Sequence, residues 1–276
     1  MCSSARHGST EGWIDSHCHL DAFLTDGSLD EVIRAARLAG VVRWIVPGVE
    51  PKTWAGVMEV CRRVAGAGFA LGVHPWYAHC YPDVDASRLK NAIGQALDGG
   101  LPVVAVGEAG LDRLRGAMAA QIEWLRVQVE CANEFGLPLI LHCVRRHGQL
   151  LEFLTRYRPA CGFVVHGFSG APELAGQYIR LGGYLGLGRA LCRPDWPHWP
   201  AFFEQVPLER ILVETDAPDM KASDWPGERN VPSNLVRVVQ ALRERLDDVG
   251  IRYPDVQAML SENTFRLFAG LPASTV

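Results

Sequence analysis

Residues 103–142 read VVAVGEAGLDRLRGAMAAQIEWLRVQVECANEFGLPLILH and contain one complete strand–helix–strand unit. An apolar run at Val103–Glu108 is followed by a long helical pattern over Ala117–Phe135. The segment Gly136-Leu137-Pro138 then leads into a second apolar run, Leu139–His142. Two short strands joined by a helix are typical of neighbouring strands in a parallel sheet. This unit therefore predicts an α/β fold.

The same alternation recurs along the whole chain and predicts eight strands. The strand candidates are Trp13–Ser16, Arg43–Val46, Phe69–Val73, Val103–Glu108, Leu139–His142, Phe163–His166, Gly183–Gly186 and Ile211–Glu214. The helix candidates are Leu29–Ala39, Trp54–Ala65, Ser87–Leu97, Ala117–Phe135, His147–Arg156, Pro172–Leu181, Leu235–Leu246 and Asp255–Phe268. Eight such units in 276 residues favour closure into a barrel.

We therefore predict a single (β/α)8 TIM barrel over residues 13–276, preceded by a flexible extension over residues 1–12. A doubly wound open sheet is the alternative, although no GxGxxG sequence opens a strand-to-helix turn to support it.

Composition narrows the possible functions. The formal net charge of −4 and the pI near 6.1 give no global basic field, so nucleic-acid binding would depend on a local patch or on metal ions. The eight cysteines contain no CxxC pair, which fits reduced thiols in a cytosol. The sequence shows no signal peptide and no apolar run long enough to span a bilayer, so we expect a cytoplasmic protein without membrane contact.

Two histidines separated by one residue, His17 and His19, follow the first predicted strand. In a strand, residues i and i+2 point to the same side, so both imidazoles can reach one ion. Taken alone the pair is as consistent with chance as with a metal site, because two ligands cannot complete a site that needs four.

The other predicted strands remove this ambiguity. Active sites of TIM barrels lie at the carboxyl ends of the strands, and there this chain places five of its nine histidines together with acidic residues. The residues at these positions are His17, His19, His74, Glu108, Asp112, His142, His166, Glu214 and Asp216. Such an arrangement indicates an enzyme with a metal centre.

The pattern predicts two divalent metal ions with mixed imidazole and carboxylate ligands. The predicted ligands are His17, His19, Glu108, His142, His166 and Asp216. His17, His19 and Asp216 would hold one ion, and His142 and His166 would hold the second. Glu108 would bridge both ions. Two ions about 3.5–4 Å apart suit phosphoester hydrolysis, since they can stabilise both the attacking and the leaving oxygen. Alternatively, Glu108 orients a ligating histidine.

Six segments in this order, DSHCHLD, GVHP, GEAGLD, LPLILHC, VVHGFSG and LVETDAP, resemble the motif series of the TatD-type metal-dependent deoxyribonucleases, and most of all the YjjV-like branch. The resemblance implies a TIM barrel of the amidohydrolase superfamily with phosphodiesterase activity and the six ligands named above. Val144 stands where many relatives carry arginine, and Val231 stands where the family carries glutamate. Both departures bear on substrate preference.

Three residues receive catalytic roles in this scheme. Asp216 is the candidate base for the attacking water, and Glu108 is the bridging ligand. His74 either contacts the substrate phosphate or assists the leaving group; the alternative is a turn histidine fixed by Pro75. We expect Asp112 and Asp15 to orient ligating imidazoles, because metal-bound histidines usually need such a partner.

The expected substrate is DNA, cleaved from single-stranded or frayed ends, and no obligate protein partner is evident. The aromatic segment Arg193–Pro200 either stacks bases or packs on the barrel rim. An amidohydrolase or lactonase acting on a small ester or amide is the second candidate function. Such sites often carry a carboxylated lysine where Glu108 stands here, which favours the phosphoesterase. The metal stays open between Mg, Mn and Zn.

Overall fold

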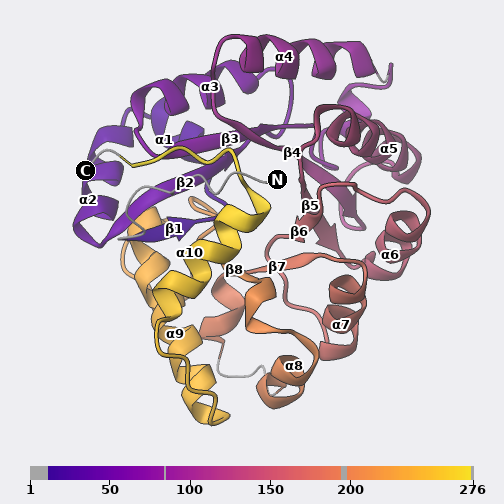
Figure 1. The fold of residues 1–276 in the computed structure, drawn as a ribbon. Helices are drawn as coiled ribbons and strands as arrows, with labels where there is room; N and C mark the ends of the chain where they lie inside the picture. Colours follow the sequence, from indigo (N-terminus) through magenta and orange to yellow (C-terminus); the bar gives the residue numbers. More distant parts are fainter. Residues whose placement is uncertain (1–11, 84, 194–197, 275–276) are drawn as a thin grey trace, which may run out of the picture.

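Eight parallel strands, each hydrogen-bonded to the next in chain order, form the sheet (Figure 1). The computed structural model describes residues 12–83, 85–193 and 198–274. The strands are β1 (Trp13–Asp15), β2 (Val41–Pro47), β3 (Ala67–Leu71), β4 (Val103–Asp112), β5 (Leu139–Val144), β6 (Phe163–Val165), β7 (Tyr184–Leu187) and β8 (Ile211–Val213). The predicted TIM barrel and its eight strands are confirmed, and the open sheet is excluded.

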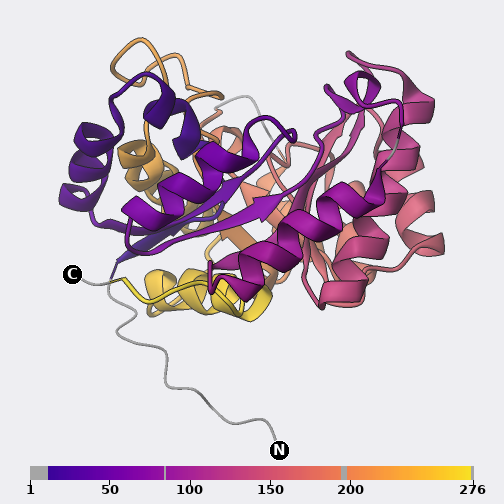
Figure 2. The same ribbon diagram turned by 90° about the horizontal axis from the view of Figure 1, so that it is seen from above.

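Helices surround the strands, as Figure 2 shows from a second direction. They are α1 (Leu20–Thr25), α2 (Leu29–Leu38), α3 (Trp54–Arg63), α4 (Ala86–Asp98), α5 (Met118–Phe135), α6 (His147–Arg156), α7 (Pro172–Arg180), α8 (Trp199–Gln205), α9 (Leu235–Asp248) and α10 (Val256–Leu267). Short 3-10 turns lie at Ala78–Cys80, Arg189–Cys192, Leu208–Arg210 and Pro232–Asn234. The two short helices α1 and α8 were not predicted, because six or seven residues show too little periodicity.

Past the ends of β1 and β8, the chain continues in two segments that lie side by side and complete the barrel. Three backbone hydrogen bonds join them: Ser16 N to Val213 O at 3.0 Å, Asp216 N to His17 O at 2.9 Å, and His19 N to Ala217 O at 2.8 Å. These bonds involve the candidate metal ligands themselves. Closure of the barrel therefore brings residues 17, 19 and 216 to one place.

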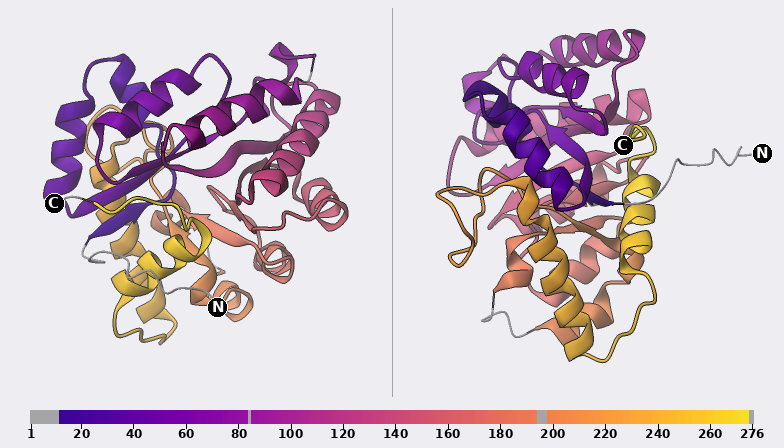
Figure 3. Two further views of the ribbon diagram at one scale, coloured as in Figure 1. Left: turned by 45° about the horizontal axis from the view of Figure 1, so that its top comes forward. Right: turned by 90° about the vertical axis from the view of Figure 1, so that its left-hand side faces the viewer.

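The opposite end of the barrel is filled by apolar side chains. Inward-facing strand residues such as Ile45, Val104 and Ile140 pack in one cluster with Phe265 of α10 and Phe268, which follows it. Figure 3 shows α10 on one side of the molecule and the loop between β8 and α9 on the other. This apolar packing covers the amino-terminal ends of the strands. A polar site can therefore form only at their carboxyl ends.

The start of β8 is held by the C-terminal helix. The side-chain amide of Asn263 in α10 donates to the carbonyl oxygens of Leu208 and Ile211, at 2.8 and 2.9 Å. In the described part of the chain, no helix combines the length and the apolar character needed to cross a membrane.

Candidate metal centre

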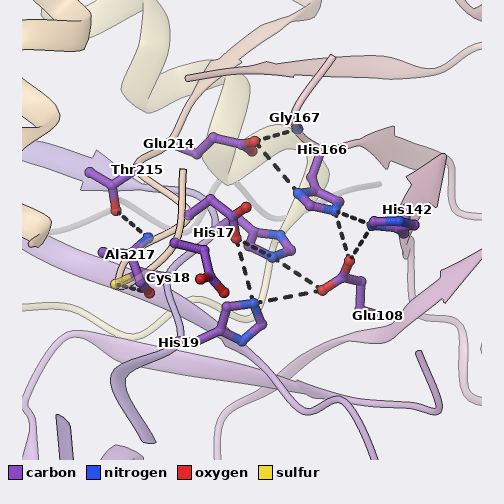
Figure 4. A network of polar contacts seen from close by, with 12 residues as sticks. His17, Cys18, His19, Glu108, His142, His166, Gly167, Glu214, Thr215 and Ala217 are labelled. Carbon is purple, nitrogen blue, oxygen red and sulfur yellow. Dashed lines mark hydrogen bonds and ion pairs between the residues drawn. The ribbon is translucent and has the colours of Figure 1, made fainter. Parts of the chain in front are cut away.

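Glu108 lies among five imidazoles at the carboxyl end of the barrel, and Figure 4 shows it beside the proposed histidine ligands. Its Oε1 atom is 2.7 Å from His166 Nε2 and 3.1 Å from His142 Nδ1. Its Oε2 atom is 3.3 Å from His17 Nε2 and 3.8 Å from His19 Nε2. The two carboxylate oxygens of Glu108 therefore face different pairs of the proposed histidine ligands, and Oε1 also faces His74.

Asp216 completes the group around the first histidine pair. Its Oδ1 atom is 3.5 Å from Nε2 of both His17 and His19. The backbone of Asp216 has a φ of 57°, a left-handed conformation that costs a non-glycine residue about 1–2 kcal/mol. The bond from its N–H to the His17 carbonyl stabilises this conformation.

Asp15 stabilises the same turn, so its predicted role was wrong. Its Oδ1 accepts from Thr215 N at 2.9 Å, and its Oδ2 accepts from the Thr215 hydroxyl at 2.6 Å. The carboxylate also lies 3.4 Å from the backbone N of His17, but it contacts no ligating ring. Burial raises the pKa of Asp15 to about 8. Asp15 joins β1 to the residue before Asp216 and so positions ligands through the backbone.

Asp112 does orient an imidazole, as predicted. Its Oδ2 accepts from His142 Nε2 at 2.9 Å and from the Trp76 indole at 2.6 Å. With the proton on Nε2, the Nδ1 lone pair of His142 faces Glu108. Burial alone would raise the pKa of Asp112, but the bonds from His142 and Trp76 lower it. Asp112 is thus an anionic acceptor that fixes one ring.

His74 differs from the other histidines of the cluster in its hydrogen bonding. Its Nδ1 accepts from the backbone N–H of Trp76 at 3.1 Å, which assigns the proton of the neutral ring to Nε2. That atom lies 3.2 Å from Glu108 Oε1. Burial lowers the pKa of His74 to about 4, so the ring is neutral. By distance alone His74, Glu108 and His142 could share an ion, but in this tautomer His74 is a donor.

The buried, unpaired ring nitrogens of the cluster fit a metal ion. His17 is fully buried, and neither of its ring nitrogens has a hydrogen-bond partner among the described residues. Nδ1 of His142 and Nε2 of His166 face each other at 3.2 Å. An unpaired buried polar atom is costly, whereas a divalent cation satisfies several such atoms at once. The residues present therefore fit the group that the motif series implies.

Three of the proposed ligands have the charge state that a bound cation needs, whereas neighbouring carboxylates raise the pKa of the other three, all imidazoles, despite their burial. Burial alone would raise the pKa of Glu108, but the surrounding imidazoles, His166 foremost, hold it well below its usual range. Burial lowers the pKa of His17, which keeps this ring neutral and able to bind a cation. Burial alone would raise the pKa of Asp216, but its bond with His19 and the neighbouring imidazoles together lower it, so this carboxylate is ionised.

Two buried glutamines of α5 hold the ends of β3 and β4, and the sequence analysis missed both. Gln128 accepts from the Val73 N–H at 2.8 Å and donates to its carbonyl oxygen at 3.1 Å. Gln121 accepts from Asp112 N at 2.8 Å and donates to Asp112 O at 3.0 Å. Each glutamine stands at a position of α5 where the helical pattern calls for an apolar residue, and this could have indicated a buried side chain with a polar partner.

Glu214 is a further residue without a predicted role. Its side chain accepts from the backbone N–H of Gly167, and its Oε1 lies 3.8 Å from His166 Nδ1 (Figure 4). A β-carbon at Gly186 would lie 2.1 Å from Glu214 Oε2, so β7 needs glycine beside this carboxylate. Glu214 thus fixes the backbone next to His166, a candidate ligand.

The two segments that depart from the family pattern lie after β8 and at the end of β5. Arg229 forms an ion pair with the exposed Asp26, and buried Asn230 donates to the Thr215 carbonyl at 2.7 Å. Val144 is half-buried at the end of β5, and Arg145 after it is exposed with a φ of 54°.

The aromatic segment after β7 gives no support for base stacking. Trp199 is only 5% exposed and packs against Phe202 and Phe203, as the rim-packing alternative predicts. Trp196 lies outside the described residues.

Histidines and carboxylates gathered at the carboxyl mouth of a TIM barrel define a metal-dependent hydrolase. The chain belongs to the TatD family, since the family model described as TatD related DNase matches residues 14–269.

Two relatives place the chain within this family. It is 34% identical over 262 residues to YjjV of Escherichia coli, named an uncharacterized metal-dependent hydrolase, covering 93% of this chain and 97% of YjjV. The crystal structure of YjjV matches with a TM-score of 0.83 at 33% identity, over 95% of this chain and 99% of YjjV. The 3'-5' ssDNA/RNA exonuclease TatD of Cronobacter sakazakii is 32% identical over 227 residues, covering 79% of this chain and 84% of that protein.

Proposed function

We propose that this protein is a two-metal phosphodiesterase that removes nucleotides from single-stranded or frayed ends of DNA. The observation that carries the proposal is the position of Glu108, with one oxygen toward His142 and His166 and the other toward His17 and His19. This is the arrangement expected of a carboxylate that bridges two cations.

The proposed ligands form two groups that share Glu108. His17, His19 and Asp216 would hold one divalent ion, and His142 and His166 would hold the other. Imidazole with carboxylate suits zinc or manganese, and phosphodiester chemistry also uses magnesium. When bound, the two ions supply the Lewis acidity that activates water and neutralises charge on the phosphoryl oxygens.

Three side chains perform the remaining steps of hydrolysis. The Asp216 carboxylate is ionised and has a side-chain exposure of 14%, so it can accept the proton of the attacking water. His74 presents a neutral Nε2–H toward the cluster and donates to a phosphoryl oxygen or to the leaving group. Glu108 stays ionised throughout because its surroundings lower its pKa.

The substrate assignment rests on the family and on the charge of the substrate. A relative that matches most of this chain is named an exonuclease of single-stranded DNA and RNA. Phosphodiesters are anionic, and a site that concentrates cations suits them better than neutral amides. Hydrolysis of a small ester or amide is the competing function.

The test compares purified protein stripped of metal and refilled with Mg²⁺, Mn²⁺ or Zn²⁺. Substrates are labelled single-stranded DNA, duplex DNA, RNA and a panel of carboxyl esters, lactones and amides. We expect stepwise shortening of single-stranded DNA, which Asp216→Asn abolishes. Carboxyl-ester or amide turnover without DNA cleavage by any metal form would overturn the proposal.

A further inference from the structure

Trp76 and Arg115 lie together at the mouth of the barrel, beside the candidate metal centre. The Arg115 guanidinium carbon is 4.0 Å from the centroid of the Trp76 ring. Trp76 is half-buried and Arg115 is exposed. We infer that this pair is a stacking platform for a nucleobase of the substrate, an inference that rests on the proposed nuclease function.

The platform is connected to a proposed ligand, His142, through a single residue, Asp112. The Trp76 indole donates to Asp112 Oδ2 at 2.6 Å, and the same oxygen accepts from His142. The Trp76 ring centroid is 5.0 Å from the His74 ring and 6.2 Å from the His142 ring. A base stacked there belongs to the nucleotide whose phosphate is cleaved or to its neighbour.

Hydrogen bonds hold the Trp76 side chain and the Arg115 backbone before any substrate binds. The Trp76 indole is held by Asp112, and the Arg115 carbonyl accepts from Gln121 Nε2 at 2.6 Å. Gly116, which follows Arg115, lies close to Pro75, which precedes Trp76. A β-carbon at Gly116, where φ is 78°, would lie only 2.9 Å from the Pro75 carbonyl oxygen. The two loops are therefore in contact, and a preformed site loses little entropy on binding.

The chemistry of the pair suits a nucleobase joined to a phosphate. Aromatic rings and arginine planes both stack bases without regard to sequence. Throughout residues 12–83, 85–193 and 198–274, no carboxylate forms an ion pair with Arg115, so its charge remains available to an anion. The neighbouring Leu114 is 62% exposed and adds apolar surface to the loop.

Binding is measured by fluorescence anisotropy in EDTA, so that cleavage does not contribute. The two probes are a labelled single-stranded oligonucleotide and a strand of equal length with abasic terminal positions. We expect the native protein to bind the first about tenfold more tightly, since stacking is worth about 1–3 kcal/mol per base. Arg115→Lys keeps the charge but loses the plane, so it should weaken binding of the base-bearing strand and bring the two affinities together.

Arg156→Lys is the matched control. Arg156 is also exposed and lies over an aromatic ring, Tyr157 at 5.2 Å, but it is on the last turn of α6, away from the carboxyl end of the strands. This variant should keep the tenfold preference. The inference would be refuted if the native protein bound both strands with equal affinity. It would also be refuted if the preference for the base-bearing strand survived Arg115→Lys.

The same experiment separates the platform from the proposed function. A base preference that depends on Arg115, in a protein that cleaves no nucleic acid with any metal, would support the platform and refute the nuclease. DNA cleavage without a base preference would refute the platform alone.

Discussion

Substituting Asp112 by asparagine should weaken metal binding although Asp112 is not itself a proposed ligand. In the native protein one carboxylate oxygen accepts from both His142 Nε2 and Trp76 Nε1, and the other accepts from Leu114 N at 2.6 Å. An asparagine side chain has only one acceptor oxygen, whereas both carboxylate oxygens of Asp112 accept hydrogen bonds. If its amide NH2 group replaces Oδ2, it must donate to His142 Nε2, which forces the ring proton onto Nδ1, the proposed ligand atom.

The magnitude follows from these three bonds. Loss of a charge-assisted bond together with one unpaired buried donor should lower the free energy of unfolding by about 2–4 kcal/mol. Loss of a carboxylate partner to a metal-bound histidine typically weakens metal binding about 10- to 100-fold.

Metal affinity is measured by competition with a chelator, and the free energy of unfolding by urea denaturation of the metal-free protein. Asp98→Asn is the control, since Asp98 is exposed at the end of α4 and lies outside the metal centre. Native metal affinity and native stability in Asp112→Asn would refute the argument that Asp112 sets the tautomer of His142.

Three further predictions concern other parts of the site and fold. Asp216→Asn should lose more than about 100-fold in kcat while its thermal unfolding in EDTA stays within a few degrees of native; an active, metal-replete variant would contradict its role as the base. Gly110→Ala should cost on the order of 3 kcal/mol, because its β-carbon would lie 2.0 Å from the His142 carbonyl oxygen at a φ of 146°. Gly136→Ala, at a φ of 65° in open space, is the control and should cost about 1 kcal/mol. The Asp26 carboxyl has a pKa of about 2, against an ordinary 3.8, because its arginine partner donates to it. Its contribution to stability is therefore present above about pH 3.8 and lost as the pH falls through 2, so Asp26→Asn should be less stable than native at pH 6 but not at pH 2.

The sequence was sufficient to predict the barrel because hydrophobic periodicity is a local property. Helix α6 begins and ends where predicted, at His147 and Arg156. Strand ends were less accurate: β5 was expected to end at His142 but continues to Val144. Pairing with β4, up to Asp112 opposite Val144, extends this strand, and the partner's length is not visible in the pattern of β5 itself.

The candidate site was predictable where strand ends carry reactive side chains, and less so where contacts depend on three-dimensional detail. Glu108 was placed among the histidines because the carboxyl ends of parallel strands share one face. Asp15 was misassigned because its partner, Thr215, is two hundred residues away in the chain. The Trp76–Arg115 contact joins two irregular loops, for which no sequence periodicity exists.

The hydrogen bonds between the segments after β1 and β8 also have a consequence for protein synthesis. A ribosome adds residue 17 near the beginning of translation and residue 216 only after about three quarters of the chain has been made. Asp216 N reaches His17 O only when both are present, so no shorter nascent chain can assemble all six proposed ligands. The proposed nuclease activity therefore requires a closed barrel.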